Sequence, residues 1–263
     1  MNKGISFYFG YKINYKERAR MIKEAGFDCV ITNADKHLNK QNGTIRQQVK
    51  IFKQVGLKLS SLHNRYNDKD LKHFFQNDKV GDKVEKNVIK DLRVAKKYGF
   101  SCVVVHLKGE FNEIGVERLK RILNVCEKLG VFLAVENVDY KEVFVKVFEC
   151  INNKYLKFCY DSGHNNFFDK HYDYLAKYGD KLVWLHLHDN DGTDDLHTLN
   201  RYGNIEWDKI AKGLSKCGEV NLDYELLMHV KGSFDAMGAL KECYKQACEL
   251  EDKINEYRNG EEK

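Results

Sequence analysis

Short apolar runs alternate with longer amphipathic stretches along the whole chain. We expect eight of these runs to form strands: Gly4–Phe9, Cys29–Asn33, Leu57–His63, Cys102–Leu107, Phe132–Val138, Leu156–Asp161, Leu182–Asp189 and Val220–Leu226. Between them, apolar residues recur at helical spacing, as at Ala19, Ile22 and Ala25. Several helical stretches end in a glycine followed by a hydrophobic residue that opens the next strand, as at Gly99-Phe100 and Gly130-Val131, which is typical of a left-handed helix cap.

Eight successive strand–helix units predict a sheet of parallel strands. Eight is also the number of strands that closes into a (β/α)8 barrel, and 263 residues suit one such domain. We therefore predict an α/β fold consisting of a single (β/α)8 TIM-barrel domain over residues 1–263. An open, doubly wound sheet is the structural alternative, but it usually has fewer strands.

The composition narrows the class of protein. Hydrophobic residues make up 43% of the chain and charged residues 32%, as in a soluble globular protein. The net charge is +5, but Lys and Glu interleave without a dense basic cluster, which disfavours a nucleic-acid partner. No apolar run approaches the roughly 18 residues of a membrane span, and the eight cysteines show no Cys-x-x-Cys spacing. We expect a reduced, cytoplasmic protein that does not enter membranes.

Residues able to bind a metal stand at or near the ends of six predicted strands. They are His63, His106, Glu136, Asp161, His164, His186, His188 and Glu225, followed by Asp195 and His197 in the loop after the seventh strand. The carboxyl ends of all strands converge on one face of such a barrel, so these residues are predicted to be neighbours. Imidazole and carboxylate ligands together favour Zn²⁺, Mn²⁺, Co²⁺ or Fe²⁺ over Mg²⁺ or Ca²⁺.

Each of these residues alone has an ordinary structural explanation, because a histidine at a strand end is more often hydrogen-bonded than metal-bound. The coincidence of six histidines and three acids at equivalent strand positions argues against that explanation for the whole set. Burying so many ions without partners would cost several kcal/mol for each. A bound cation removes this cost, and we therefore predict a divalent-metal site.

Five motifs extend this pattern: Glu136-Asn137, Asp161-Ser162-Gly163-His164, His186-Leu187-His188-Asp189-Asn190-Asp191-Gly192, Asp195-Leu196-His197 and Gly203-Asn204-Ile205. Their order and spacing resemble the xylose isomerase-like TIM-barrel superfamily, which contains sugar-phosphate isomerases and epimerases together with the family 2 AP endonucleases. The similarity covers essentially the whole chain. It is specific for the superfamily and does not name a substrate.

The resemblance to the isomerase and epimerase branch implies one divalent metal, with zinc, manganese or cobalt expected. Its implied ligands are Glu136, Asp161, His186 and Glu225. The His-x-x-Asp spacing from His186 to Asp189 selects His186 as the histidine ligand, and His188 is the second choice. Glu136 and Glu225 are the implied catalytic pair, one removing a proton beside the carbonyl of a sugar or sugar phosphate and the other returning it through an enediolate. The implied substrate-binding or additional metal residues are His63, His106, His164, His188, Asp195 and His197.

Endonuclease IV, a zinc-dependent AP endonuclease, is the alternative within the same superfamily. It holds three zinc ions with nine side chains, and the candidates for them here are His63, His106, Glu136, Asp161, His164, His186, Asp195, His197 and Glu225. Tyr66, three residues beyond His63, is placed to wedge into an abasic site. The lack of a dense basic surface and the sugar-branch character of the motifs at Asp161 and His188 favour the sugar enzyme.

A dehydratase or other lyase acting on polyols such as inosose is a further alternative, because function depends on the site and not on the barrel. Lys108, Arg201 and Lys231 are the candidates for contact with a substrate phosphate. Phe167, Phe168 and Trp207 are candidates for closing over the substrate or for a subunit contact in a homo-oligomer.

Overall fold

The computed structural model describes residues 1–227 and 234–260. Its strands are β1 Lys3–Ser6, β2 Cys29–Asn33, β3 Lys58–His63, β4 Cys102–Val105, β5 Phe132–Glu136, β6 Leu156–Asp161, β7 Leu182–His186 and β8 Leu222–Tyr224. Its α-helices are α1 Tyr15–Glu24, α2 Asn39–Asn42, α3 Ile45–Val55, α4 Asp68–Leu71, α5 Lys79–Tyr98, α6 Glu113–Leu129, α7 Lys141–Cys150, α8 Ser162–Phe168, α9 Tyr174–Tyr178, α10 Trp207–Ser215 and α11 Ala236–Arg258. Short 3-10 helices are η1 Lys36–Leu38, η2 Lys72–Phe75 and η3 Gly179–Lys181.

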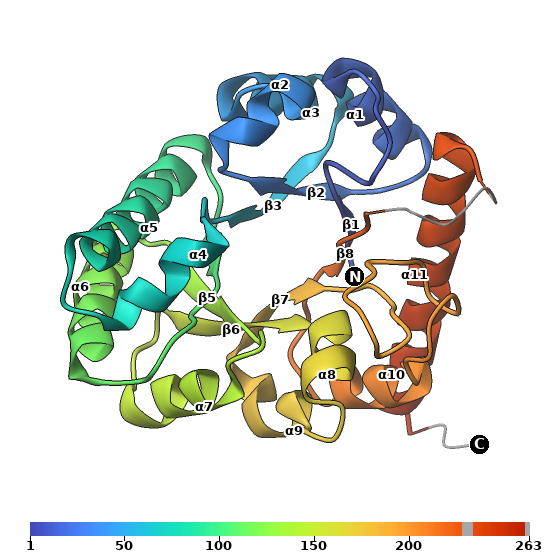
Figure 1. Ribbon diagram of the computed structural model, residues 1–263. Helices are drawn as coiled ribbons and strands as arrows, with labels where there is room; N and C mark the ends of the chain where they lie inside the picture. The colour runs from blue at the N-terminus through green and yellow to red at the C-terminus, as the bar shows by residue number, and fades with distance from the viewer. Residues whose placement is uncertain (228–233, 261–263) are drawn as a thin grey trace.

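The strands form one parallel eight-stranded sheet in the order β7-β6-β5-β4-β3-β2-β1-β8, with helices around the outside (Figure 1). An isolated parallel bridge between Leu187 and Tyr224 joins the two ends of this sheet. There the Leu187 N–H donates to Asp223 O at 2.8 Å, and the Glu225 N–H donates to Leu187 O at 3.0 Å. The predicted (β/α)8 barrel is therefore confirmed.

Several strands are shorter than their apolar runs. The first ends at Ser6 and not at Phe9, although Phe7 and Phe9 are buried. The eighth likewise ends at Tyr224, before the buried Leu226. The apolar runs continue past these strand ends because Phe7, Phe9 and Leu226, in the outgoing segments, also pack in the core.

The predicted left-handed helix caps are present at Gly99 and Gly130, whose φ angles are 90° and 63°. At Gly99 the N–H donates to Ala95 O at 2.9 Å, which satisfies a carbonyl at the end of α5. These caps turn the chain sharply into β4 and β5. They thereby set where each strand begins relative to the barrel wall.

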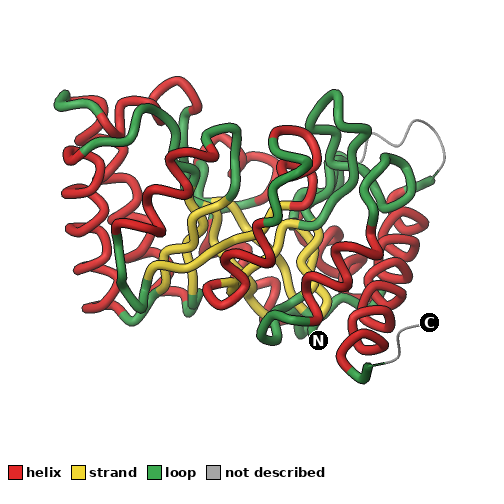
Figure 2. Tube along the Cα trace, turned by 90° about the horizontal axis from the view of Figure 1, so that it is seen from below, coloured by secondary structure: helices red, strands yellow, loops and turns green. Residues whose placement is uncertain are grey.

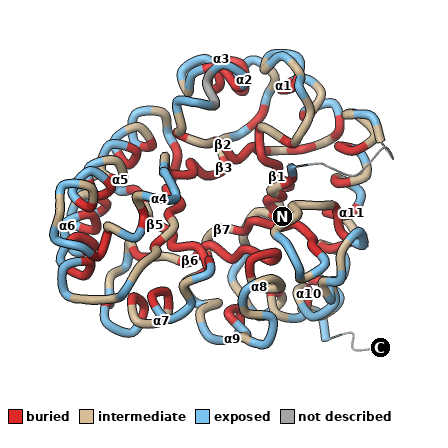
Figure 3. The backbone as a smooth tube through the Cα atoms, in the orientation of Figure 1, coloured by how far each residue is buried: buried red, intermediate tan, exposed pale blue. Residues whose placement is uncertain are grey.

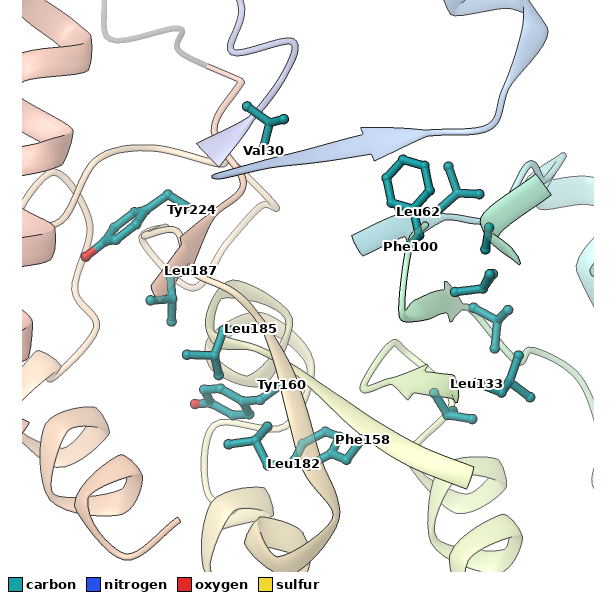
Figure 4. Packing of buried hydrophobic residues seen from close by; sticks show 14 of the residues in the cluster. Val30, Leu62, Phe100, Leu133, Phe158, Tyr160, Leu182, Leu185, Leu187 and Tyr224 are labelled. Carbon is teal, nitrogen blue, oxygen red and sulfur yellow. The ribbon is translucent and has the colours of Figure 1, made fainter. Parts of the chain in front are cut away.

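The main core lies between the barrel wall and the surrounding helices, while a smaller apolar cluster of Cys102, Val104, Ala134 and Cys159 lies apart from it. Buried residues follow the strands and the inner faces of the helices (Figure 3). Figure 4 shows Tyr160, Leu185, Leu187 and Tyr224 along the β6–β8 part of the wall. Seen from the side, loops rise beyond the strand ends opposite the N-terminus (Figure 2). Within the described residues, no helix is both long and apolar enough to cross a membrane.

Candidate metal centre

The candidate ligands come from the carboxyl ends of six neighbouring strands. His63, Glu136, Asp161 and His186 are the last residues of β3, β5, β6 and β7, while His106 and Glu225 directly follow β4 and β8. The register pairs Asp161 with His186, which brings two of these strand ends level with each other. Glu136, Asp161 and His186 are each at most 1% exposed. The barrel thus gathers distant residues at one edge, as the strand-end pattern predicts.

Four of these side chains, Glu136, Asp161, His186 and Glu225, form what we call the central group. One potential ligand atom from each lies within 4.8 Å of the other three. His186 Nδ1 lies 3.2 Å from Glu136 Oε2 and 3.2 Å from Glu225 Oε2. The residues named from the family resemblance as ligands of a single metal are therefore close enough together to share one cation.

Two further sets flank the central group. In the His63 group, His63 Nε2 lies 3.2 Å from His106 Nε2, which in turn lies 3.1 Å from Glu136 Oε2. Glu136 therefore belongs to both this group and the central one. In the His164 group, Asp195 Oδ2 lies 3.3 Å from His164 Nε2 and 3.1 Å from His197 Nε2.

His188 lies behind the central group and next to the His164 group. Its Nε2 is 3.0 Å from Asp161 Oδ1, and its ring stacks on that of His197 with 3.8 Å between centroids. The ring is fully buried. His186, the first choice from the motif spacing, lies in the central group, and His188 does not.

Burial and neighbouring charges act in opposite directions on the pKa values in this centre. Burial would raise the pKa of Glu136, but His186 and His106 hold that pKa well below its usual range. Burial would likewise lower the pKa of His197, but the hydrogen bond with Asp195 and other nearby carboxylates raise it to about 9. The neighbouring imidazoles therefore favour the ionised form of Glu136, and the neighbouring carboxylates favour the protonated form of His197.

Several buried atoms in the centre have no well-formed hydrogen bond within the described part of the chain. They include Glu136 Oε1, both ring nitrogens of His186, and Asp195 Oδ1. Buried polar atoms normally have a partner, and leaving them without one is costly. Imidazole nitrogen and carboxylate oxygen are suitable donors to Zn²⁺, Mn²⁺ or Co²⁺. The residues present therefore fit a divalent cation.

Asp161 is held in place by the segments around it. Asn137 Nδ2 donates to Asp161 O, and the Asp161 N–H donates to Asn137 Oδ1, both at 2.8 Å. Asp161 Oδ1 also accepts the backbone N–H of His164 at 2.6 Å and so caps α8. A Cβ atom on Gly163 would lie 1.9 Å from His188 Cε1, so the glycine allows that ring to approach. The Asp-Ser-Gly-His motif thus builds both a ligand position and a helix start.

Asp189 organises the loop of residues 189–205, which carries Asp195 and His197. Its buried carboxylate accepts the backbone N–H of Arg201 at 3.0 Å and that of Ile205 at 3.1 Å. His197 has a φ of 49° and Arg201 a φ of 71°, conformations that non-glycine residues keep only with support from their surroundings. The sequence marked Asp189 only by its spacing from His186, and its part in holding this loop depends on contacts that the fold creates.

The remaining candidates lie in different surroundings. Trp207 donates its indole N–H to Asp189 Oδ2 at 2.9 Å, so it supports the loop. Phe168 lies at the centre, with its ring centroid 5.7 Å from that of His164. Lys231 lies outside the described residues.

A model of the xylose isomerase-like TIM barrel family matches residues 19–226. The chain therefore belongs to this family.

Solved structures with sugar-enzyme names have the same fold. A D-tagatose 3-epimerase-like protein has a TM-score of 0.78 at 20% identity, with 97% of this chain and 99% of that chain covered. The D-psicose 3-epimerase of Clostridium cellulolyticum H10 has a TM-score of 0.70 at 14% identity, covering 98% and 99%. An IolI protein with a bound zinc atom has a TM-score of 0.73 at 16% identity, also covering 98% and 99%. At these identities the likeness establishes the fold alone.

Curated relatives match over part of their length. The protein y4fM of Sinorhizobium fredii is 31% identical over 97 residues, which cover 34% of this chain and 31% of y4fM. The protein MJ1614 of Methanocaldococcus jannaschii is 26% identical over 156 residues, covering 53% of this chain and 61% of MJ1614. The chain thus spans about a third to three fifths of the length of these relatives.

Proposed function

We propose that this protein is a divalent-metal-dependent isomerase or epimerase of sugars. The observation that carries the proposal is the central group, in which two glutamates, an aspartate and a histidine converge within 4.8 Å. The names of the similar structures, which are sugar epimerases and a zinc-binding IolI protein, support the same class of reaction. A small sugar is the substrate that this proposal implies.

Glu136, Asp161, His186 and Glu225 would hold the metal. When bound, the cation supplies Lewis-acid polarisation of a sugar carbonyl and its neighbouring hydroxyl. Glu136 ends β5 and Glu225 directly follows β8, and one carboxylate oxygen of each lies 3.2 Å from His186 Nδ1. One carboxylate removes the proton beside the carbonyl, and the other returns a proton to the resulting enediolate. His186, fully buried, approaches both carboxylates through the same ring nitrogen.

The test combines metal content with proton exchange. Protein purified without chelator is expected to contain at least one divalent ion per chain, and a panel of ketoses incubated with it in D₂O is expected to gain deuterium beside the carbonyl. Glu136→Gln and Glu225→Gln should each abolish this exchange and leave the far-ultraviolet circular dichroism unchanged. Glu110→Gln, which alters an exposed loop carboxylate, is the matched control and should exchange normally. Normal exchange in either of the first two variants would exclude the two-glutamate mechanism.

The flanking groups favour one second candidate, a zinc-dependent nuclease acting at abasic sites. The His63 and His164 groups each offer three potential ligand atoms within 4.8 Å, and together with the central group they account for three cations. Several cations in one site would stabilise the attacking and leaving oxygens of a phosphodiester. The nuclease would use this barrel and the nine side chains of the central, His63 and His164 groups.

Elemental analysis separates the two candidates. About one exchangeable ion per chain, with deuterium exchange into a sugar, supports the isomerase or epimerase. Three zinc ions per chain, with nicking of a duplex that carries an abasic site, would replace it with the nuclease. His63→Ala removes a ligand from the His63 group only. The variant should therefore keep the metal of the central group and the sugar reaction, and it should lose the nicking activity.

A further inference from the structure

Exposed apolar side chains gather around the metal centre. The large hydrophobic residues with more than a third of their surface exposed, within the described residues, are Tyr66, Ile114, Phe168, Tyr202 and Leu227. Three of these, Tyr66, Phe168 and Leu227, adjoin histidines of the centre, and we call them the apolar rim. A mouth lined by apolar groups above a few polar ones is typical of a small-molecule site.

Two of the rim residues are aromatic and contact different groups of the centre. The Tyr66 ring lies 4.9 Å from the ring of His106 and 5.4 Å from that of His63, between centroids. The Phe168 ring, at the end of α8, lies 5.7 Å from that of His164. The rim thus begins on the β3 side of the centre and continues on the β6 side.

Leu227 extends the rim from β8. It lies two residues beyond Glu225, and its backbone N–H donates to His197 O at 3.2 Å. Its side chain remains 37% exposed, whereas Leu226 beside it is fully buried in the core. The three rim side chains therefore come from three different strand ends around one polar centre.

Within the described residues, two cationic side chains near this face, Lys108 and Arg65, are paired with carboxylates. Lys108 Nζ lies 3.0 Å from Asp68 Oδ1 and 3.0 Å from Asp139 Oδ1. Arg65 Nε donates to Asp91 Oδ1 at 2.7 Å. A phosphate bound here would compete with these carboxylates for the two side chains, whereas an uncharged group would not.

We propose, on the basis of the function proposed above, that the substrate is an uncharged carbohydrate, with its reacting carbon atoms at the centre and its C–H faces against Tyr66, Phe168 and Leu227. A terminal phosphate would lie against the apolar rim and lose its hydration there, so sugar phosphates are poor ligands. Flat aromatic faces bind C–H surfaces at little conformational cost because each ring is already held by the histidines beneath it. The rim therefore selects the class of sugar, and the central group performs the chemistry.

The experiment measures binding by titration calorimetry on the metal-loaded, full-length protein. The probes are unphosphorylated ketoses, their methyl glycosides, and the same ketoses carrying a terminal phosphate. We expect the uncharged probes to bind at least ten-fold more tightly than their phosphorylated counterparts. Tyr66→Ala and Phe168→Ala should each weaken uncharged-probe binding about ten-fold, as expected for losing about 50 Å² of apolar contact. Both variants should keep the wild-type metal content.

Ile114→Ala is the matched control, since Ile114 has a similar exposure at the start of α6 and should bind every probe like the wild type. Tighter binding of phosphorylated sugars, failure of every uncharged probe to bind, or wild-type affinity in both rim variants would overturn the proposal. Rim-dependent binding of an uncharged sugar without deuterium exchange would instead contradict the proposed isomerase or epimerase and leave the assigned ligand class intact. Deuterium exchange on sugar phosphates alone would contradict the assigned ligand class and leave the proposed isomerase or epimerase intact.

Discussion

A buried carboxyl group in β8, outside the central group, makes a quantitative test of this fold. Asp223 is the middle residue of β8 and is fully buried. Burial raises its pKa from an ordinary 3.8 to about 6, although Ser60 donates a hydrogen bond to Oδ2 and Cys29 Sγ lies 3.5 Å from Oδ1. A Cβ atom on Gly4 would lie 1.7 Å from Asp223 Oδ1, so this carboxyl group occupies the space left by a glycine.

The sign of the effect follows from proton linkage. Between its unfolded pKa of 3.8 and its folded pKa of about 6, Asp223 binds more protons when the chain is folded. Its protonation therefore stabilises the fold fully below pH 3.8, and that contribution is lost as the pH rises through about 6. A shift of about 2 pKa units corresponds to about 3 kcal/mol, a large part of the 5–15 kcal/mol by which domains are typically stable. Somewhat less than half of the change falls between pH 5 and pH 8.

The perturbation is Asp223→Asn, which keeps the size of the side chain and removes the charge. Urea unfolding of both proteins, followed by circular dichroism in chelator, gives the free energy of unfolding at each pH from 5 to 8. Relative to the wild type, the variant should gain about 1 kcal/mol of stability over this range. Comparing the two proteins at each pH cancels the titration of groups that do not interact with Asp223; His186, which lowers the pKa of Asp223, is not one of them. A stability difference that is constant with pH, or that falls as the pH rises, would refute the assignment of a buried carboxyl group with a raised pKa at this position.

Three further predictions concern the metal centre and its supports. Asp189→Asn should weaken metal binding about 10- to 100-fold in titration calorimetry, because the amide no longer accepts all the N–H groups that hold the loop of residues 189–205. The control is Asp191→Asn, in the exposed part of the same loop, which should bind metal like the wild type. Metal affinity should rise as the pH increases above 7, because a cation in the central group must displace the proton of His186, whose pKa is held well above its usual range by Cys159, Glu225 and Glu136 in spite of burial. An affinity that does not change with pH would mean that this ring is not a ligand. Gly163→Ala should lower the melting temperature by several degrees and reduce the metal content, because the methyl group would collide with the ring of His188. An unchanged melting temperature and metal content would contradict the close packing of this ring on Gly163.

The features that the sequence determined by itself are local ones. Apolar periodicity marks eight strand–helix units, and the glycines at positions 99 and 130 mark where two helices end. These signals can be recognised in the sequence because the helix and strand periods and the left-handed cap depend only on residues that are close together along the chain. Parallel topology adds that all strand ends share a face, so residues such as Glu136 and His186 were predicted to meet.

The tertiary structure decided how those residues divide into groups. Glu136 is shared between the central and His63 groups, whereas His188 lies against Asp161 and outside both groups. These positions differ by a few ångströms, and the spacing of the residues along the chain does not predict such differences. The support given by Asp189 to its loop and the burial of Asp223 likewise depend on contacts between segments far apart in sequence. Strand register and barrel closure set these distances, and both result from packing of the whole molecule. The sequence therefore determined which residues reach the site, and the closed barrel decided which of them lie close enough to act together.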